Sequence, residues 1–407
     1  MNCRHCLNKL KHILVDLGFS PPSNAYLSLE GLKRPEITYP LRVFICENCW
    51  LVQTEDYARA DELFHPEYSY FSSTSTSWLD HTKQYFAMIR EMLKLDENSY
   101  VIEVGSNDGY LLKNFVKMGI PCLGIEPTDI TANVAEQLGI PVLRDFFGEE
   151  MGNHLVAEDK QADLIIANNV YAHVPDINGF TRGLKVLLKP RGTITLEFTS
   201  LIRLIDQCLF DIIYHEHYSY LALSTVIQIF EQSGLRVFHV ENFPVQGGSL
   251  RIFACHTDDP RPTGSIVNEQ LEKEEKFGLR DLKIYRDFQT RSDQIKNDFK
   301  FFLIEQKRNG KLVGAYGAAA KGNTLLNYSG VKLDLLPWVC DAAPSKQGKF
   351  LPGSHIPIVP PSVIKENKPD FILISPWNIA EEIINDLDYV RDWEGKFVRA
   401  IPKLEIF

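Results

Sequence analysis

Histidine, glutamate and tyrosine side chains crowd into the seven residues from Tyr214 to Tyr220, which read Tyr-His-Glu-His-Tyr-Ser-Tyr. A neutral imidazole can remove a proton near pH 7, and the carboxylate of Glu216 could orient a histidine and stabilise its charged form. In an extended segment, Glu216 would face away from His215 and His217. These histidines are two residues apart, whereas a helical pair of zinc ligands is four apart. The segment therefore favours acid–base chemistry over metal binding.

A glycine-containing turn follows the apolar run Val101–Val104. A strand that leads through such a turn into a helix is typical of nucleotide-binding folds, where backbone N–H groups approach a ligand too closely to tolerate side chains. Gly105 and Gly109 have the spacing G-x-x-x-G, and Asn107 occupies the position of the second glycine of a dinucleotide site. Glu126, 21 residues after Gly105, ends the next apolar run and could accept hydrogen bonds from ribose hydroxyls. This combination favours S-adenosylmethionine (SAM) over NAD.

Two further segments place polar side chains after apolar runs, at the edge where open α/β sheets bind ligands. Asn168 and His173 follow the run Leu164–Ala167, and His173 could be catalytic or could cap or pack a helix. Asp145 and Phe146 follow a shorter run, where a carboxylate could accept from an adenine amino group while a ring packs on the base. The candidate cofactor contacts are Gly105, Ser106, Asn107, Gly109, Glu126, Asp145, Phe146 and Asn168.

Two C-x-x-C pairs, Cys3/Cys6 and Cys46/Cys49, account for half of the eight cysteines. Four thiolates in a reducing compartment are typical of a tetrahedral zinc site. Such a closed shell leaves no position for water, so the metal would staple a small domain and take no part in chemistry. A module of about 60 residues has difficulty building its own core, which explains the staple. The alternative is two redox pairs or unrelated thiols.

A second alternating unit lies near the C-terminus. Leu312–Tyr316 is expected to be a strand, and residues 317–323 a turn that opens a helix. Lys321 and Asn323 would lie near the start of that helix, where backbone N–H groups and a positive charge could hold a phosphate or diphosphate. The alternative is that Lys321 is an ordinary surface lysine.

Predicted strands and helices alternate along the chain around these sites. This alternation predicts an α/β protein with doubly wound, mostly parallel sheets. We expect a zinc-binding module at 1–60, a Rossmann-like SAM-binding domain at 61–262 and a second Rossmann-like lobe at 263–407. Residues 265–305 carry charges at helical spacing and are expected to form one long exposed helix between the lobes. The predicted central strands are Val101–Val104, Cys122–Ile125, Leu164–Ala167, Thr193–Phe198 and Leu250–His256.

The net charge of −10, with lysine and arginine scattered, argues against nucleic acid or an anionic membrane as a partner. No apolar stretch is long enough for a transmembrane helix, and no signal peptide is recognisable, so a cytoplasmic protein is expected. A monomer or a weak oligomer is expected.

Taken together, the motifs resemble the SAM-dependent sugar C-3 methyltransferases, zinc-containing enzymes that methylate carbon 3 of nucleotide-linked 4-keto-6-deoxy sugars. The resemblance rests on the two C-x-x-C pairs and on residues 103–109, 168–176, 214–220 and 317–323, and it covers nearly the whole chain. It implies a zinc module, a central SAM lobe and a C-terminal lobe that helps to bind the nucleotide sugar, usually a dTDP sugar.

The resemblance also implies roles for individual residues. The residues around the sugar would be His217 as the general base, Tyr214, Glu216, His173 and Tyr68, and the nucleotide-sugar contacts would be Lys321 and Asn323. A ketone at C-4 acidifies the C-3 hydrogen, so a base could form an enolate while a tyrosine or His173 donates to the enolate oxygen. The carbanion would attack the sulfonium methyl without a catalytic metal. Whether His217 or His173 is the base stays open.

Three alternatives remain. The same SAM lobe could serve an O- or N-methyltransferase, which needs a base but no enolate. An NAD-dependent sugar dehydrogenase or epimerase is opposed by Asn107 in the glycine turn. A zinc-ribbon binding protein with a degenerate enzyme lobe is opposed by the intact cluster around His217.

Overall fold

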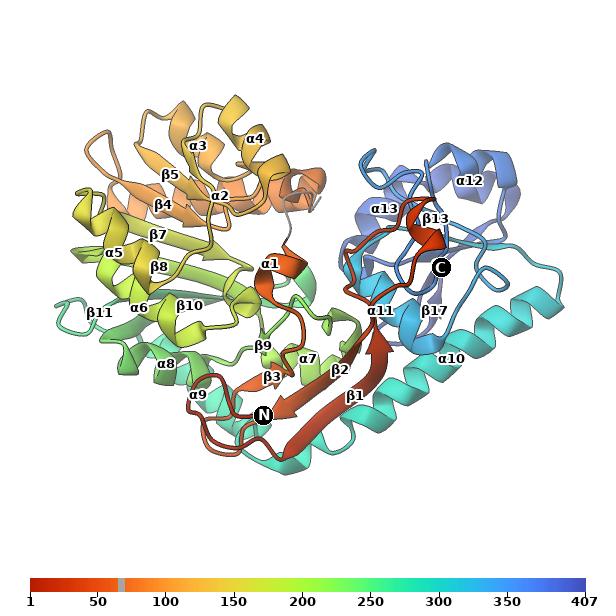
Figure 1. The fold of residues 1–407 in the computed structure, drawn as a ribbon, viewed down its shortest axis with the longest axis horizontal. Coiled ribbons are helices and arrows are strands. Elements are labelled where there is room, and N and C mark those ends of the chain that lie inside the picture. Colours follow the sequence, from red (N-terminus) through yellow and green to blue (C-terminus); the bar gives the residue numbers. More distant parts are fainter. Residues whose placement is uncertain (65–69) are drawn as a thin grey trace.

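The computed structural model describes residues 1–64 and 70–407. The described residues form three sheets, one for each expected part, and the expected α/β class is confirmed. Figure 1 shows the central lobe beside the C-terminal lobe, with strands β1 (His12–Ser20) and β2 (Tyr39–Ile45) below them. Within the described residues, no helix has both the length and the apolar composition needed to cross a bilayer.

The N-terminal sheet is antiparallel and has the order β1-β2-β3-β9. Its third strand, β3 (Val52–Thr54), pairs with β9 (Ser219–Tyr220), which comes from the histidine-rich segment. The sheet is therefore completed by a strand from the middle of the chain, so the cysteine module is joined directly to the candidate catalytic residues.

The central sheet has seven strands in the order β10-β11-β8-β7-β4-β5-β6. The strands are β4 (Val101–Val104), β5 (Cys122–Ile125), β6 (Val142–Leu143), β7 (Ala162–Asn168), β8 (Leu188–Thr199), β10 (Leu235–Phe243) and β11 (Ser249–His256). Strands β4 to β8 are parallel, and β10 and β11 are antiparallel additions. All five predicted central strands are confirmed, whereas β10 was not predicted because its polar residues interrupt the apolar run.

Helices cover both faces of this sheet. They are α2 (Thr76–Leu93), α3 (Leu112–Lys117), α4 (Asp129–Gln137), α5 (Glu149–Ala157), α6 (Ile177–Leu187) and α8 (Leu223–Gln232). Helix α7 (Leu201–Gln207) packs instead in the buried cluster that includes β1. A one-turn helix, α1 (Ala60–Leu63), links the N-terminal sheet to this lobe.

The C-terminal sheet has the order β14-β13-β12-β15-β16-β17, and only β17 is antiparallel to its neighbour. Its strands are β12 (Val313–Tyr316), β13 (Val339–Cys340), β14 (Ile358–Val359), β15 (Phe371–Ile374), β16 (Lys396–Arg399) and β17 (Glu405–Ile406). Its helices are α11 (Ala320–Ser329), α12 (Ser362–Asn367) and α13 (Ala380–Asp386). The predicted second Rossmann-like lobe therefore has its strands and helices in alternation.

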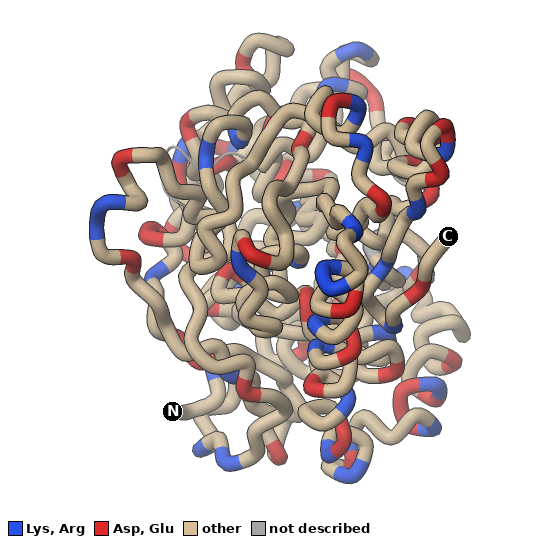
Figure 2. The backbone as a smooth tube through the Cα atoms, turned by 90° about the vertical axis from the view of Figure 1, so that its right-hand side faces the viewer, with Lys and Arg blue, Asp and Glu red and all other residues tan. Residues whose placement is uncertain are grey.

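The expectation of one long helix at 265–305 is wrong. Helix α9 (Ser265–Phe277) ends at Gly278, whose φ of +90° reverses the chain, and α10 (Phe288–Arg308) begins ten residues later. A left-handed glycine at this position is a common helix terminator. Acidic and basic residues are interspersed over the face shown in Figure 2, as expected from their scatter along the sequence.

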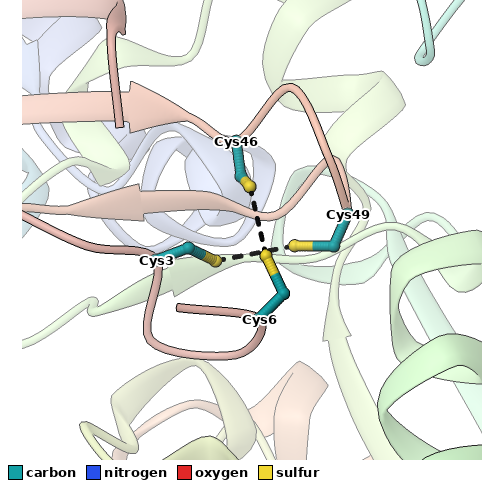
Figure 3. Close-up of side chains that lie close together, drawn as sticks. All are labelled: Cys3, Cys6, Cys46 and Cys49. Atoms are coloured by element: carbon teal, nitrogen blue, oxygen red, sulfur yellow. Dashed lines mark hydrogen bonds between the residues drawn. The ribbon is translucent and has the colours of Figure 1, made fainter. Parts of the chain in front are cut away.

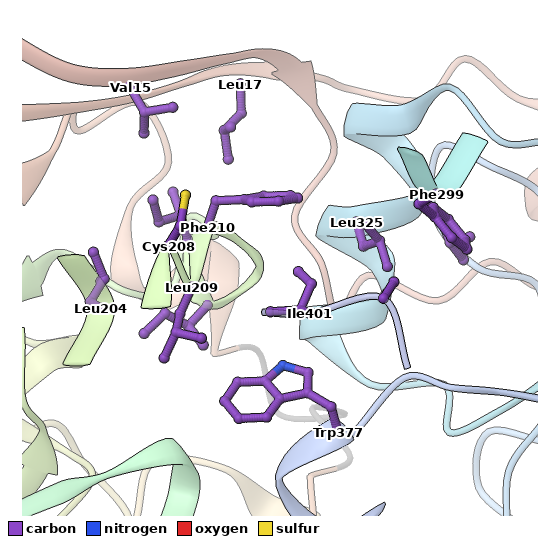
Figure 4. Close-up of a cluster of buried hydrophobic side chains, with 14 of the residues drawn as sticks. Val15, Leu17, Leu204, Cys208, Leu209, Phe210, Phe299, Leu325, Trp377 and Ile401 are labelled. Carbon is purple, nitrogen blue, oxygen red and sulfur yellow. The ribbon is translucent and has the colours of Figure 1, made fainter. Parts of the chain in front are cut away.

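One buried apolar cluster draws on all three parts of the molecule. It includes Val15 from β1, Phe210 from the segment before the histidines, Leu325 from α11 and Ile401 near the C-terminus (Figure 4). Because these side chains pack on one another, residues 210–217 are held by the N-terminal sheet and by both lobes.

Candidate active site and cysteine cluster

The four cysteines of the two C-x-x-C pairs converge at the end of the N-terminal sheet (Figure 3). Their Sγ atoms all lie within 4.8 Å of one another, and the Cys3–Cys49 and Cys6–Cys46 pairs are each 3.5 Å apart. Tetrahedral zinc with Zn–S bonds of about 2.3 Å requires sulfur atoms about 3.8 Å apart. Gln53 Nε2 donates to Cys3 Sγ at 3.2 Å, a contact suited to a metal-bound thiolate. The cluster therefore fits a closed zinc site.

The two glycines of the turn after β4 are required mainly by the protein's own packing. Both have positive φ, +66° at Gly105 and +75° at Gly109. A Cβ on Gly105 would lie 2.5 Å from Val170 Cγ2, and one on Gly109 would lie 2.4 Å from Ile140 Cδ1. This corrects the expectation that a ligand excludes the side chains, because neighbouring residues already do so.

Glu126 lies beside the turn, as its position after β5 predicted. Its carboxylate accepts from the Asn107 backbone N–H at 2.9 Å and from the Thr128 N–H at 3.0 Å, so it holds the turn in place. Burial raises its pKa, and the hydrogen bonds from Thr128 and Asn107 oppose that rise. Ribose binding by Glu126 would have to use the remaining acceptor capacity of these oxygens.

Other predicted cofactor contacts divide into buried and exposed groups. Ser106 Oγ packs against Gly124, so its hydroxyl faces the sheet. Asn168 Oδ1, at the carboxyl end of β7, is buried and has no hydrogen-bond partner among the described residues, which fits a ligand at that edge. Asp145 Oδ1 accepts from the Phe146 N–H at 2.7 Å, and the Phe146 ring lines a cavity of about 500 Å³ together with Pro175.

Residues just before α2 cover the glycine turn. Asn107 Oδ1 accepts from the Ser72 N–H at 2.8 Å, and Asn107 Nδ2 donates to the Tyr70 carbonyl at 2.8 Å. Asp108 Oδ2 accepts from the Ser73 N–H at 3.1 Å. The hydroxyl-rich segment therefore packs on the turn. Tyr68, expected near the sugar, lies outside the described residues.

His217 is held in one tautomer by its two ring contacts. Its Nδ1 lies 2.6 Å from the Ile212 carbonyl oxygen, which can only accept, so Nδ1 carries the hydrogen. Its Nε2 therefore carries the lone pair, which accepts from the Tyr214 hydroxyl at 2.8 Å. Burial lowers the pKa of His217 well below 6.5, and the neighbouring His173 and Lys321 lower it further. The imidazole is thus neutral at physiological pH.

His173 lies beside His217, with ring centroids 4.6 Å apart. Its Nδ1 donates to the Glu216 carbonyl at 2.7 Å, which leaves Nε2 as an acceptor. Burial lowers the pKa of His173 to about 4. The expectation that His173 donates to an enolate oxygen conflicts with this tautomer, and Tyr214 is the better placed donor.

The pKa of His173 makes stability depend on pH. Because burial favours the neutral form, the unfolded chain binds more protons than the folded chain between pH 6.5 and about 4. The free energy of unfolding therefore decreases as the pH is lowered through that window. Between pH 7 and pH 5 this site should cost about 2 kcal/mol of the free energy of unfolding. Between pH 7 and pH 5, urea unfolding should show a loss about 2 kcal/mol smaller in His173→Asn than in the wild type, because the variant lacks this titrating group while its amide can still donate to the Glu216 carbonyl. Equal losses in both proteins would contradict this assignment.

The side chains of Glu216 and His215 both contact the N-terminal module. The Glu216 carboxylate points to the N-terminal module, where Asn24 Nδ2 donates to Oε1 at 3.1 Å, and it orients His173 only through its backbone carbonyl. His215 Nε2 donates to the Pro40 carbonyl at 3.2 Å. The segment is therefore a loop whose side chains diverge, with His217 and Tyr214 together and His215 apart.

Helix α11 of the C-terminal lobe lies near the segment that carries Tyr214 and His217. Lys321 Nζ lies 2.9 Å from Asn378 Oδ1 and 5.1 Å from the centre of the Trp377 ring, so it is no ordinary surface lysine. Burial lowers the pKa of Lys321, and the charge of Asp211 opposes this. Asn323 is buried and its Oδ1 has no hydrogen-bond partner among the described residues. Both predicted substrate contacts thus lie at the junction of the lobes.

Two residues that the sequence analysis missed support this junction. Asn24 binds Glu216, and Asp211 Oδ2 accepts from Trp377 Nε1 at 2.6 Å. Burial raises the pKa of Asp211 to about 6, and the charge of Lys321 opposes that rise. No local sequence pattern pointed to the bond between Asn24 and Glu216, because the two residues are 192 positions apart.

Comparison with known proteins places this geometry in a family. The family model "Putative zinc binding domain" matches residues 3–64, "Methyltransferase domain" matches 78–240 and "C-methyltransferase C-terminal domain" matches 244–402. The C-methyltransferase NovU of Streptomyces niveus is 32% identical over 401 residues, which cover 98% of this chain and 95% of that protein.

More distant matches cover smaller shares of the chain. A ubiquinone biosynthesis O-methyltransferase of Paramagnetospirillum magneticum is 28% identical over 117 residues, which cover 28% of this chain and 45% of that protein. The crystal structure of a magnesium protoporphyrin IX methyltransferase from Synechocystis matches 44% of this chain and 79% of its own, at 13% identity and a TM-score of 0.34. On the full-length match to NovU and the family models, this chain belongs to the C-methyltransferase family and is a SAM-dependent enzyme with a zinc-binding N-terminal module.

Proposed function

We propose that this enzyme transfers the methyl group of SAM to C-3 of a nucleotide-linked 4-keto-6-deoxy sugar, with dTDP as the expected nucleotide. The observation that carries the proposal is the pairing of His217 Nε2 with the Tyr214 hydroxyl at 2.8 Å. Because the Ile212 carbonyl fixes the hydrogen of His217 on Nδ1, Nε2 can accept a proton from carbon.

Methylation at carbon needs a carbon nucleophile, and a neighbouring ketone is the simplest way to make one. When the sugar binds, the Tyr214 hydroxyl would turn from His217 Nε2 and donate to the C-4 oxygen, where negative charge develops. The lone pair that it leaves on Nε2 would then remove the C-3 hydrogen. The C-3 hydrogen and the C-4 oxygen are neighbours on the sugar, which suits a base and a donor that lie 2.8 Å apart. His173, whose Nε2 carries no hydrogen in this tautomer, is the second candidate for the base.

The cofactor and the base meet at the carboxyl edge of the central sheet. His217 and Asn169 line one cavity of about 30 Å³, and Asn169 directly follows Asn168 at the end of β7. Bound SAM would be held by the glycine turn, Glu126 and Asn168, and it supplies an electrophilic methyl with its own leaving group. The cavity is smaller than a hexose, so the surrounding side chains would have to move when the sugar binds.

The C-terminal lobe would hold the nucleotide. Lys321 lies in the first turn of α11 and lowers the pKa of His217 through its charge, which supports a position beside the reacting groups. Asn323, one half-turn further, offers a buried oxygen without a partner among the described residues. If the N-terminal end of α11 binds the diphosphate, the attached sugar would extend towards His217.

The test is incubation of the purified enzyme with SAM and a panel of nucleotide sugars, read by mass spectrometry. We expect 4-keto-6-deoxy sugars to gain the mass of one methylene group, and the matching 4-hydroxy sugars to stay unchanged because they cannot form the enolate. Methylation of the 4-hydroxy sugars at a comparable rate would contradict the proposal, as would no methylation of any 4-keto sugar.

A further inference from the structure

Arg4 lies between Cys3 and Cys6 in the chain, yet its side chain contacts residues outside the cysteine cluster. The side chain is only 4% exposed. Its Nη2 donates to the Thr54 carbonyl at 2.9 Å, at the end of β3, and forms an ion pair with Asp56 Oδ1 at 2.7 Å. The Arg4 guanidinium donates to residues other than the cysteines, so metal binding does not explain its position.

The same guanidinium reaches both histidine-bearing segments. Its Nη1 donates to the Pro175 carbonyl at 3.2 Å, two residues after His173. Its carbon atom lies 5.2 Å from the centre of the Tyr218 ring, and Tyr218 directly follows His217. A planar group with several donors can bridge such contacts at once, which lysine cannot do.

Two residues that contact the Arg4 side chain, Thr54 and Tyr218, also form hydrogen bonds with the segments that carry His217 and His173. Thr54, which receives Nη2, donates from its Oγ1 to the His217 carbonyl at 2.7 Å. Tyr218, which packs under the guanidinium, donates its N–H to the Ala172 carbonyl at 2.8 Å, beside His173. The segments that place the two imidazoles 4.6 Å apart are therefore linked to each other and to Arg4.

The knuckle itself is fixed on the opposite side. The Arg4 N–H donates to Gln53 Oε1 at 2.9 Å, while Gln53 Nε2 donates to Cys3 Sγ. His5 Nδ1 lies 2.8 Å from Asn178 Oδ1, and Asn178 Nδ2 donates to the His5 carbonyl at 2.9 Å. The position of Arg4 thus depends on the fold of the cysteine cluster and on the start of α6.

We infer that Arg4 is a positioning residue that couples the zinc knuckle to the active site by setting the relative positions of His173 and His217. Arg4 lies between Cys3 and Cys6 in the chain, so the metal site fixes its backbone. Its guanidinium in turn holds the segment that carries His173. The inference rests on the proposed role of His217 as a base. It assigns the N-terminal module a part in catalysis beyond holding its own fold together.

The test compares Arg4→Met with Arg34→Met, the same substitution at an exposed arginine of the same module. For Arg4→Met we expect kcat to fall about tenfold or more, since small displacements of a base are costly. The zinc content per chain, the Kd for SAM and the KM for SAM should stay within about twofold of the wild type, because no SAM contact is removed. Arg4→Lys should recover part of kcat, because it restores the charge and one donor.

A second readout does not depend on turnover. In long-range ¹H–¹⁵N spectra of histidine-labelled protein, assigned with His217→Asn, the ring signals of His173 and His217 should shift in Arg4→Met but not in Arg34→Met. Unchanged kcat and unchanged ring signals would overturn the inference, and so would a fall in kcat that matches a loss of zinc. Should Arg4→Met fail to fold, Arg4→Lys decides by the same criteria. A wild type that methylates no 4-keto sugar would instead refute the proposed function.

Discussion

Replacing His217 by asparagine should lower kcat by about 100-fold or more, because the variant has no base where the C-3 hydrogen would lie. The asparagine amide can still donate to the Ile212 carbonyl, which receives Nδ1 in the wild type, so the loop should keep its shape. The Kd for SAM should stay within about twofold, since His217 makes no expected cofactor contact. Steady-state kinetics and calorimetric titration of SAM measure both quantities.

The matched control is His215→Gln, two residues away. Glutamine can replace the Nε2 donor of His215 towards the Pro40 carbonyl, and this side chain lies outside the proposed reaction. Its kcat should stay within about threefold of the wild type. Near-normal turnover of His217→Asn would remove His217 from the role of base and leave His173 as the candidate.

Removing one thiolate from the cysteine cluster should have the second large effect. Cys49→Ser leaves three sulfur ligands, and we expect the protein to lose its zinc, the N-terminal sheet to unfold and turnover to vanish. The loss reaches the active site because β9 pairs with β3 and Thr54 Oγ1 holds the His217 carbonyl. Metal analysis should find one zinc per wild-type chain, and thermal unfolding should report the destabilisation.

Cys122→Ala provides the control for this experiment, since Cys122 is also buried but lies on β5 away from the cluster. It should keep its zinc and most of its activity, with a loss of about 1 kcal/mol from the smaller side chain. Full activity of a zinc-free Cys49→Ser protein would show that the module has no part in holding the active site.

Local patterns along the chain were sufficient for much of the architecture. Val101–Val104 and Cys122–Ile125 are apolar runs bounded by turn residues, and each forms the strand predicted. The C-x-x-C spacing is typical of zinc ligands, so the sequence predicted that the four cysteines would lie together. Gly278 shows the limit of such patterns, because helical periodicity continues across it while its left-handed backbone ends α9.

Long-range pairings were beyond the reach of local patterns. Residues separated by more than 150 positions are joined by the pairing of β9 with β3, by the bond between Asn24 and Glu216, and by the contacts of Arg4 with Pro175 and Tyr218. No periodicity or propensity encodes which distant carbonyl a side chain will meet. The roles of individual histidines therefore depended on tertiary structure, which sends His215 and His217 to different partners although they are two residues apart.

Enolate formation, the central claim, is tested most directly by the fate of hydrogen at C-3. A nucleotide 4-keto sugar with deuterium at C-3 should lose that deuterium for every methyl group it gains, because the base must remove it before the carbon can attack. Mass spectra of the product should then show one new methyl group and no deuterium at C-3. A methylated product that retains the deuterium would contradict the account, because the methyl group would then lie on an atom other than C-3.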